Sequence, residues 1–589
     1  MLQSPGANSG LEESTVPQTS VNLAPSSTLV KTLNKTLVAF FLLSGLLFAA
    51  PTITVVSPKT GSSGGSPVYY EAYASSTCAN GISAMRIYSA PSVAAYTTDG
   101  SHIETFLTLS PGSYSTVINA WDNCGGVATT TIKVTVSATT GVTVYLPSAS
   151  SANVPIHVAA SAQNSSCAAG ISAMRIYTSP GVTPYTIDSN QLDAFITLAP
   201  GNYHLVVEAY DNCGHVYTSP FTERATTTPD RYLYAADPNN IYQFPLTNGS
   251  VGALAQETTP TGSPSPELLA MLADAGGDFV YATATGAVGW VYGYQIDRRT
   301  GSLSAVPGSP FEVALGTMVL DPNGQFLYMA AETGANKTIT LSSYRINRSS
   351  GALSLASSAT MPEQSAFAIG INYTGAYVYV TSIPESSSTE EISVYSVNAN
   401  DGALTEIAGS PYSIPGTAGQ YYSPPTSTWK YLYQPQVYDT VQQQLWGYEI
   451  GSDGALTTVP GSPFPEGQNP LSPALADWLT RYIWATGTPS SGNVIYTSPI
   501  DASTGAVGAA TSVNVGSSDY TNLTEDHSGE YLYGGGSQLT SQCTAYDGPF
   551  CPDAVGSWKV DSGGTLTEQS QVALSHASGP GIVAVATSH

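Results

Sequence analysis

The sequence predicts an all-β protein in which two tandem β-sandwiches precede a seven-bladed β-propeller. The composition favours strands and tight turns, with 56 Gly, 40 Pro and 37 Tyr among 589 residues. Residues 52–225 contain one segment twice, and residues 229–589 contain one unit seven times. Neither region contains a run with helical periodicity, so both repeats are expected to be built from short strands.

Residues 1–50 are predicted to be a polar segment followed by a signal peptide or anchor. A Ser-, Thr- and Pro-rich stretch leads to an apolar run at 37–50, which is short for a membrane span and suits the core of a signal peptide. Glu12 and Glu13 before the run, and Pro51 after it, keep a signal anchor or a start codon placed upstream open as alternatives. We expect an extracytoplasmic protein, in the periplasm, at the cell surface or secreted, with no other membrane-integral domain.

The duplicated region predicts two domains, at 52–138 and 141–225. ANGISAMRIYSAP at Ala79 recurs as AAGISAMRIYTSP at Ala168, an offset of 89 residues that also relates both cysteines of one copy to both cysteines of the other. Sequence alone does not fix disulfide pairing, but this repeat favours one bond within each copy. Disulfides are typical of exported proteins. The predicted pairs are Cys78 with Cys124, Cys167 with Cys213, and Cys543 with Cys551.

Each copy contains a short motif, LSPGSY at 109–114 and LAPGNY at 198–203. The motif resembles the tyrosine corner of immunoglobulin-like sandwiches. The resemblance implies an immunoglobulin-like fold for both copies, but the cysteines follow strands instead of lying within them. The bonds are therefore expected to join two loops at one end, and antibody-type recognition is not implied. Asp122-Asn123 and Asp211-Asn212 beside the cysteines are interpreted as turns, with a calcium loop as the alternative.

The C-terminal repeat predicts about four short strands per unit, which is the size of a propeller blade. An aromatic residue recurs every 47 to 54 residues, and a Gly-x-Leu/Val turn follows in each unit. The first unit lacks an inner strand, and the apolar segment from Gly581 to Ala586 is predicted to supply it and close the ring. The aromatic register is Tyr234, Tyr281, Tyr328, Tyr379, Tyr433, Trp484 and Tyr533.

Several blade motifs carry a family resemblance. DPNGQFLY at Asp321, together with ISVYSVN and the recurring TGSLSAVPGSPF and DGALTEIAGSPY, resembles the lactonase-type seven-bladed propellers, which include bacterial 6-phosphogluconolactonases of the propeller kind. The resemblance covers residues 229–589. It implies the fold strongly and the activity weakly, because these motifs are turns and paired aromatics.

Charge excludes two classes of partner. The chain has 41 acidic and 16 basic residues, a formal charge of −25, which argues against nucleic acid and anionic lipid. A sugar phosphate needs convergent cations. Only Lys337 is expected on the ligand-binding face, since Arg298, Arg299 and Arg348 fall in turns of the opposite face.

The candidate site is the channel mouth formed by the loops between second and third strands and between blades. Its predicted catalytic residue is His576, which could activate water for lactone hydrolysis. Tyrosines there could stack on sugar rings. No metal or cofactor is predicted, although loop carboxylates leave Ca²⁺ open. The predicted ligand-binding residues are Tyr421, Tyr422, Tyr438, Asp439, Tyr546, Asp547 and Asp553.

These observations favour an exported ligand-binding or scaffold protein, in which the two sandwiches form a spacer arm and the propeller presents a ligand face. The alternative is an extracytoplasmic lactonase or another sugar-active hydrolase that uses the channel mouth. The expected partner is a glycan, a small sugar-like molecule or an envelope protein. We expect the chain to be a monomer.

Overall fold

The computed structural model confirms the all-β prediction. It describes residues 50–588 except 79, 90–92, 139, 165, 180–184, 262–266, 286–288, 334–337, 362–363, 385–388, 416–420, 438–442, 466–473, 488–491, 539–550 and 575–580, and the described residues form strands and turns without a helix. Accordingly, no helix in this part of the chain is long and apolar enough to cross a membrane. The predicted signal or anchor segment lies outside the described residues.

The first sandwich consists of a three-stranded and a five-stranded sheet, in the orders β1-β3-β6 and β2-β8-β7-β4-β5. Alternate side chains of both sheets point inward, as the 0% exposure of Met85 on β4 illustrates. The strands are β1 (Thr52–Ser57), β2 (Ser62–Gly64), β3 (Val68–Ser75), β4 (Ile82–Tyr88), β5 (Tyr96–Asp99), β6 (His102–Leu107), β7 (Gly112–Asp122) and β8 (Val127–Val136).

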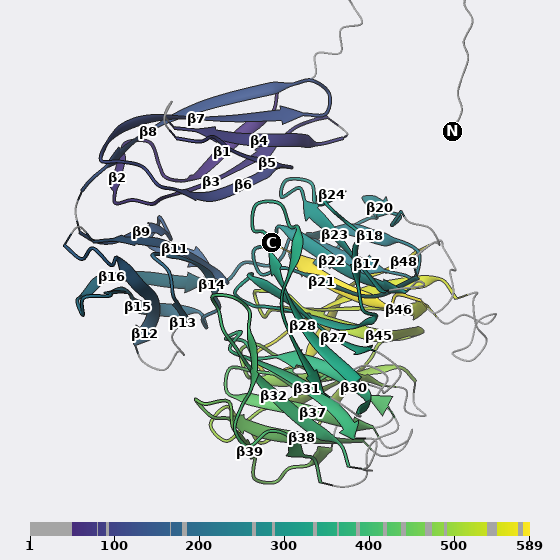
Figure 1. Ribbon diagram of the computed structural model, residues 1–589. Helices are drawn as coiled ribbons and strands as arrows, with labels where there is room; N and C mark the ends of the chain where they lie inside the picture. Colours follow the sequence, from purple (N-terminus) through teal and green to yellow (C-terminus); the bar gives the residue numbers. More distant parts are fainter. Residues whose placement is uncertain are drawn as a thin grey trace, which may run out of the picture. The chain divides into compact units, whose positions relative to one another are not determined.

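The second sandwich repeats this topology, with the orders β9-β11-β14 and β10-β16-β15-β12-β13. Met174 on β12 takes the place of Met85 and is also fully buried. The duplicated sequence therefore folds twice into the same pair of sheets (Figure 1). The strands are β9 (Gly141–Leu146), β10 (Ser151–Asn153), β11 (Ile156–Gln163), β12 (Ile171–Ser179), β13 (Tyr185–Ile187), β14 (Gln191–Ile196), β15 (Gly201–Asp211) and β16 (Val216–Thr226).

The cysteine pairing within each copy is confirmed. Cys78 is bonded to Cys124 and Cys167 to Cys213, each pair 46 residues apart in sequence. Both bonds join the turn after one strand to the turn after another, as expected. Cys543 lies outside the described residues, so the third pairing stays a prediction.

The turns beside the disulfides also match their interpretation. Asp122 Oδ1 accepts the backbone N–H groups of Cys124 at 3.0 Å and Gly126 at 2.6 Å, and Asp211 repeats the pattern in the second copy. Each carboxylate is thus used by its own turn. The tyrosine corner is present too, because Tyr114 donates its hydroxyl proton to the carbonyl of Ser110 at 2.6 Å.

The remaining described strands form seven sheets arranged as propeller blades (Figure 1). Blade 1 contains β49 (Ala584–Ser588), β17 (Tyr232–Ala236), β18 (Ile241–Thr247), β19 (Ser250–Val251) and β20 (Gln256–Thr258). Blade 2 contains β21 (Glu267–Ala273), β22 (Phe279–Thr285), β23 (Gly289–Ile296), β24 (Leu303–Ala305) and β25 (Phe311–Val313). Blade 3 contains β26 (Gly316–Leu320), β27 (Phe326–Thr333), β28 (Thr338–Ile346) and β29 (Leu353–Met361).

The other four blades follow the same order from the inner to the outer strand. Blade 4 contains β30 (Gln364–Ile371), β31 (Tyr377–Pro384), β32 (Glu391–Val397), β33 (Leu404–Glu406) and β34 (Tyr412–Ser413). Blade 5 contains β35 (Tyr421–Tyr422), β36 (Thr426–Ser427), β37 (Tyr431–Val437), β38 (Gln443–Ile450), β39 (Leu456–Thr458) and β40 (Phe464–Pro465). Blade 6 contains β41 (Leu475–Ala476), β42 (Tyr482–Gly487), β43 (Val494–Pro499) and β44 (Thr511–Asn514). Blade 7 contains β45 (Ser518–Glu525), β46 (Tyr531–Gln538), β47 (Asp553–Val560) and β48 (Leu566–Ala573).

The recurring aromatic and glycine residues join neighbouring blades. All seven residues of the aromatic register have 0% exposure. Tyr234 of blade 1 donates its hydroxyl proton to the carbonyl of Gly301 in blade 2 at 2.8 Å, and Tyr281 of blade 2 donates to Gly351 in blade 3 at 2.8 Å. Gly301 and Gly351 have φ values of 73° and 72°, which L side chains rarely adopt. The repeat therefore encodes an interblade hydrogen bond.

The C-terminal strand completes the first blade. β49 pairs antiparallel with β17, with Ala584 opposite Ala236 and Ser588 opposite Tyr232. The yellow C-terminal strand accordingly lies among the teal strands of blade 1 (Figure 1). The chain end and blade 1 thus share one sheet, as the missing inner strand predicted.

Candidate functional site

One face of the propeller is formed by the turns between first and second strands and between third and fourth strands. The two sandwiches contact this face. Ser349 in the third blade accepts the backbone N–H of Glu104 in the first sandwich at 2.8 Å, and Phe195 in the second sandwich donates its N–H to the carbonyl of Asn323 at 3.3 Å. Residues 50–589 accordingly form a single compact unit.

Arginines of these turns hold the contact. The sequence register places Arg298 and Arg348 on this face, and in the structure their guanidinium groups lie over Tyr73 of the first sandwich at 4.3 Å and over Phe195 of the second at 4.4 Å. A guanidinium over an aromatic face is a favourable cation–π contact. The arginines are thus used for docking the sandwiches.

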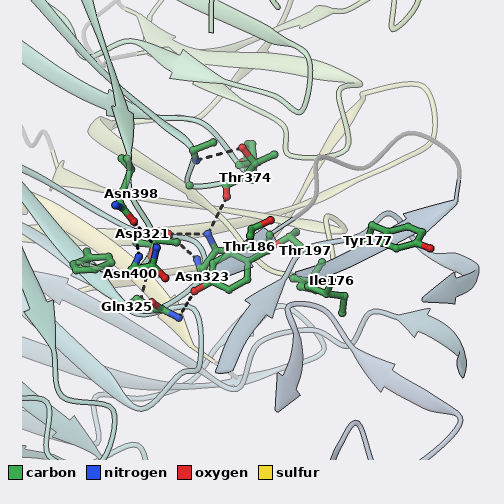
Figure 2. A pocket seen from close by; sticks show the side chains of 18 of the residues that line it. Ile176, Tyr177, Thr186, Thr197, Asp321, Asn323, Gln325, Thr374, Asn398 and Asn400 are labelled. Carbon is green, nitrogen blue, oxygen red and sulfur yellow. Dashed lines mark hydrogen bonds between the residues drawn. The ribbon is translucent and has the colours of Figure 1, made fainter. Parts of the chain in front are cut away.

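A cavity of about 370 Å³ lies where the second sandwich meets blades 3 to 5. Figure 2 shows its polar wall, where Asp321, Asn323 and Gln325 of the propeller face Thr186 and Thr197 of the second sandwich. The cavity is of the size that holds a small organic ligand. Its remaining lining residues are Ile176, Tyr177, Tyr185, Asp188, Ile196, Phe326, Tyr373, Thr374, Gly375, Ala376, Val397, Asn398, Ala399, Asn400 and Trp429.

The DPNGQ turn of blade 3 fixes the polar wall. Asp321 Oδ1 accepts the backbone N–H of Asn323 at 2.9 Å, and Asp321 Oδ2 accepts that of Gln325 at 3.2 Å. Asn323 Nδ2 donates to the carbonyl of Thr374 in blade 4 at 2.8 Å, and Gln325 Nε2 donates to the hydroxyl of Tyr185 at 2.5 Å. Burial raises the pKa of Asp321 to about 6, so the wall gains a carboxyl group that is easily protonated.

An aromatic pair provides the apolar part of the cavity. Tyr373 and Trp429 stack with ring centroids 6.0 Å apart and an angle of 27° between their planes. Both side chains are partly exposed. Across the cavity, Asn400 Nδ2 donates to Asp188 Oδ2 of the second sandwich at 3.1 Å. Flat rings beside amide and carboxyl groups suit an uncharged ligand that has both apolar faces and hydroxyl groups.

Where the first sandwich, the second sandwich and the propeller meet, ionisable side chains are buried together. His157 Nε2 lies 2.7 Å from Asp193 Oδ1, and Arg348 Nε lies 3.4 Å from Glu104 Oε2. Burial opposes the charge of His102, but Asp278, with Glu71 and Glu104, raises its pKa above the ordinary value. This group joins three parts of the chain through charge.

The channel mouth predicted from sequence is on the opposite face, and most of its candidate residues fall outside the described residues. These are Tyr438, Asp439, Tyr546, Asp547 and the predicted catalytic His576. Tyr421 and Tyr422 form β35, and only their backbone is described. The structure therefore does not bring the predicted ligand-binding residues together into a site.

Asp553 differs from its prediction. The sequence analysis places it in a rim loop, whereas it is the first residue of β47 and has 0% exposure. Its carbonyl accepts the backbone N–H of Leu574 at 2.7 Å. The strand begins earlier than expected because residues before the aromatic register pair with β46. Direct contact with a ligand at the mouth is excluded for this buried position.

Glu390, which precedes β32, is a buried carboxyl on the predicted face. It is 3% exposed, and Gln434 Nε2 donates to its Oε1 at 3.5 Å. Burial raises its pKa to about 7. A carboxyl group with a pKa in this range can act as a general acid or base near neutral pH.

The Glu390 carboxyl predicts a pH-dependent stability difference. A raised pKa means that its stabilising, protonated form is complete below the ordinary pKa and is lost as pH rises through about 7. Glu390→Gln is therefore expected to match the wild type near pH 5 and to be more stable near pH 9, by up to about 3 kcal/mol. Urea unfolding between these pH values measures it. Glu391→Gln is the control, and a difference that is independent of pH would contradict the assignment.

The cavity residues were missed from sequence because they belong to repeated turns. Asn323 and Gln325 lie in a motif that reads as a blade turn, and Tyr373 lies in the equivalent turn of blade 4. Trp429 is the one available signal, since no other blade has a tryptophan beside the aromatic pair that begins its second strand except blade 6. The second sandwich, which covers these turns, makes them a cavity.

Comparisons with known proteins agree with the propeller fold. A family model described as lactonase, 7-bladed beta-propeller, matches residues 279–409. No curated protein matches the sequence. Solved structures similar to the chain include a putative 6-phosphogluconolactonase from Bacteroides fragilis, with 12% identity, a TM-score of 0.42, and coverage of 62% of this chain and 99% of that one. The periplasmic gluconolactonase of Pseudomonas aeruginosa has 13% identity, a TM-score of 0.42, and coverage of 59% and 97%.

Proposed function

We propose that this protein is an exported binding protein that holds an uncharged saccharide, or a similar polyhydroxylated molecule, between its second sandwich and its lactonase-like propeller. The observation that carries the proposal is the 370 Å³ cavity, which places the Tyr373–Trp429 pair beside the polar wall of Asn323 and Gln325. Sugars offer apolar ring faces to aromatic side chains and hydroxyl groups to amides. No Lys or Arg lines the cavity, so an anionic sugar fits it less well.

The two disulfides support export, since such bonds persist in oxidising compartments. The tyrosine corners support an immunoglobulin-like assignment for both sandwiches. In this proposal the sandwiches are part of the binding site. They are not a free spacer arm, because the second one supplies a wall of the cavity.

A binding screen tests the proposal. The purified chain is titrated by calorimetry with a panel of uncharged mono- to tetrasaccharides, and binding of at least one of them is expected. Trp429→Ala is then expected to weaken that binding at least about tenfold, or about 1.4 kcal/mol, because it removes half of the stacking surface. Tyr88→Ala, which removes an aromatic side chain that is 39% exposed on β4, is the control and is expected to bind normally. Equal affinity in the Trp429 variant would remove the cavity from the proposal.

An extracytoplasmic lactonase is the second candidate function. The match of residues 279–409 to the lactonase family model favours it, and the buried carboxyl of Glu390 on the opposite face has the raised pKa that a general base needs. Hydrolysis of glucono-δ-lactone, followed by acid release, separates the two functions. Turnover that Glu390→Gln reduces while Trp429→Ala leaves it intact would favour the lactonase.

A further inference from the structure

The buried ionisable group at the junction of the three modules has an unusual composition. Within the described residues, Glu104 of the first sandwich and His157 and Asp193 of the second each direct a potential metal-ligating atom to one point, and these atoms all lie within 4.8 Å of one another. His157 Nε2 is 3.6 Å from Glu104 Oε1 and 2.7 Å from Asp193 Oδ1. The hydroxyl of Tyr69 is also near, donating to Glu104 Oε1 at 2.8 Å.

The other nitrogen of His157 faces a second carboxylate. Glu71 Oε2 lies 3.6 Å from His157 Nδ1. A carboxylate behind the imidazole is the usual outer partner of a metal-bound histidine, because it fixes the ring and its tautomer. The order carboxylate, imidazole, carboxylate pair is therefore the order found around protein-bound zinc.

His102 is an independent sign that a partner belongs here. Its side chain is 2% exposed, and neither ring nitrogen makes a hydrogen bond within the described part of the chain. Nε2 points at the cluster, 3.6 Å from Glu71 Oε1 and 3.9 Å from Glu104 Oε2. A buried imidazole without a hydrogen bond is costly, so a ligand that draws these carboxylates together would suit it.

Charge balance points in the same direction. Four carboxylates are buried at the junction, those of Glu71, Glu104, Asp193 and Asp278, against the two guanidinium groups of Arg298 and Arg348. With neutral imidazoles, two negative charges remain uncompensated. A divalent cation supplies both missing charges at once.

We propose that Glu104, His157 and Asp193 bind a divalent transition-metal ion, with Zn²⁺ as the preferred one, and that the ion links the first sandwich to the second. One imidazole with carboxylate oxygens suits zinc, whereas calcium takes oxygen ligands alone. The Tyr69 hydroxyl or a water completes four-coordination. A neighbouring cavity of about 480 Å³, lined by Glu71 and His157 among others, gives the ion a route of entry.

The test uses the whole exported chain at a fixed pH of 7.5. After dialysis against EDTA, titration with ZnCl₂ is expected to show one high-affinity site per chain and a rise in the melting temperature. His157→Asn is expected to weaken zinc binding at least about tenfold. The matched control is His215→Asn, since His215 also lies beside a carboxylate, 2.9 Å from Asp211, but has a 59% exposed ring.

Each outcome decides the proposal. Loss of the site in His157→Asn with retention in His215→Asn supports it. Equal binding in both variants, or only weak binding at several sites, overturns it. If His157→Asn fails to fold, zinc-edge X-ray absorption of the wild type replaces it. A shell of nitrogen and oxygen with imidazole scattering supports the proposal, and a shell containing sulfur or lacking imidazole overturns it.

Discussion

Removal of residues 581–589 is expected to destabilise the entire propeller and to abolish its cooperative melting. The deletion removes β49, whose described residues Ala584–Ser588 are all buried and pair along the whole of β17. It also removes Ile582, which has 0% exposure and packs in the cluster that joins blade 7 to blade 1 through Tyr533 and Val555. At about 25 cal/mol per Å² of apolar area, the loss amounts to at least several kcal/mol. An open ring also exposes two strand edges.

Thermal melting and guanidinium unfolding of the truncated chain measure the effect. A point variant separates ring closure from simple shortening. Val585→Asp in the full-length chain places a charge in the cluster between blades 7 and 1 and is expected to reproduce most of the loss. Val585→Ile keeps the apolar contact and is expected to cost little. A truncated protein that melts like the wild type would show that β49 does not hold the ring.

Ring closure could be predicted from sequence because the information is local and repeated. Each blade states its own strand order through the aromatic residue, the glycine turn and the leucine or valine that follows. The first blade lacked one strand, and only the C-terminal segment remained to supply it. The structure adds the reason for the register, since Tyr234 and its equivalents bond to a glycine carbonyl one blade later. A recurring contact leaves a recurring sequence signal.

The disulfides were predictable for the same reason. One offset relates Cys78 to Cys167 and Cys124 to Cys213, so intramolecular duplication selected the pairing that spacing alone could not. Asp122 and its equivalent were also readable, because a side chain that bonds to its own turn needs no distant partner.

The candidate site was not predictable, because its contacts join residues far apart in sequence. Asn323 bonds to Phe195, and Glu104 bonds to Ser349, with nothing in either segment that names the other. Arg348 could be placed in a turn of the correct face, but its aromatic partner could not be identified. The predicted channel mouth relied instead on loops that do not repeat from blade to blade. Those loops supply no register from which to place a side chain.

Docking of the second sandwich depends on a tryptophan from the propeller. Trp478 lies in the turn between β41 and β42, is 5% exposed, and belongs to the core cluster of the second sandwich together with Val154 and Leu198. Its backbone N–H donates to Glu525 Oε2 of blade 7 at 3.2 Å, which fixes the turn to the neighbouring blade. One side chain thus contributes to the cores of two domains.

Trp478→Ala is therefore expected to release the second sandwich from the propeller. Truncation of a buried tryptophan costs about 3 to 5 kcal/mol, and most of that loss falls on the contact between the domains. Calorimetry is expected to resolve two transitions where the wild type has one, and limited proteolysis is expected to cut the linker near Thr227. Trp446→Ala is the matched control, because Trp446 is 8% exposed within blades 4 and 5 and is expected to lower propeller stability without separating the domains. If Trp478→Ala melts in one transition and keeps saccharide binding, docking rests on the arginine contacts instead.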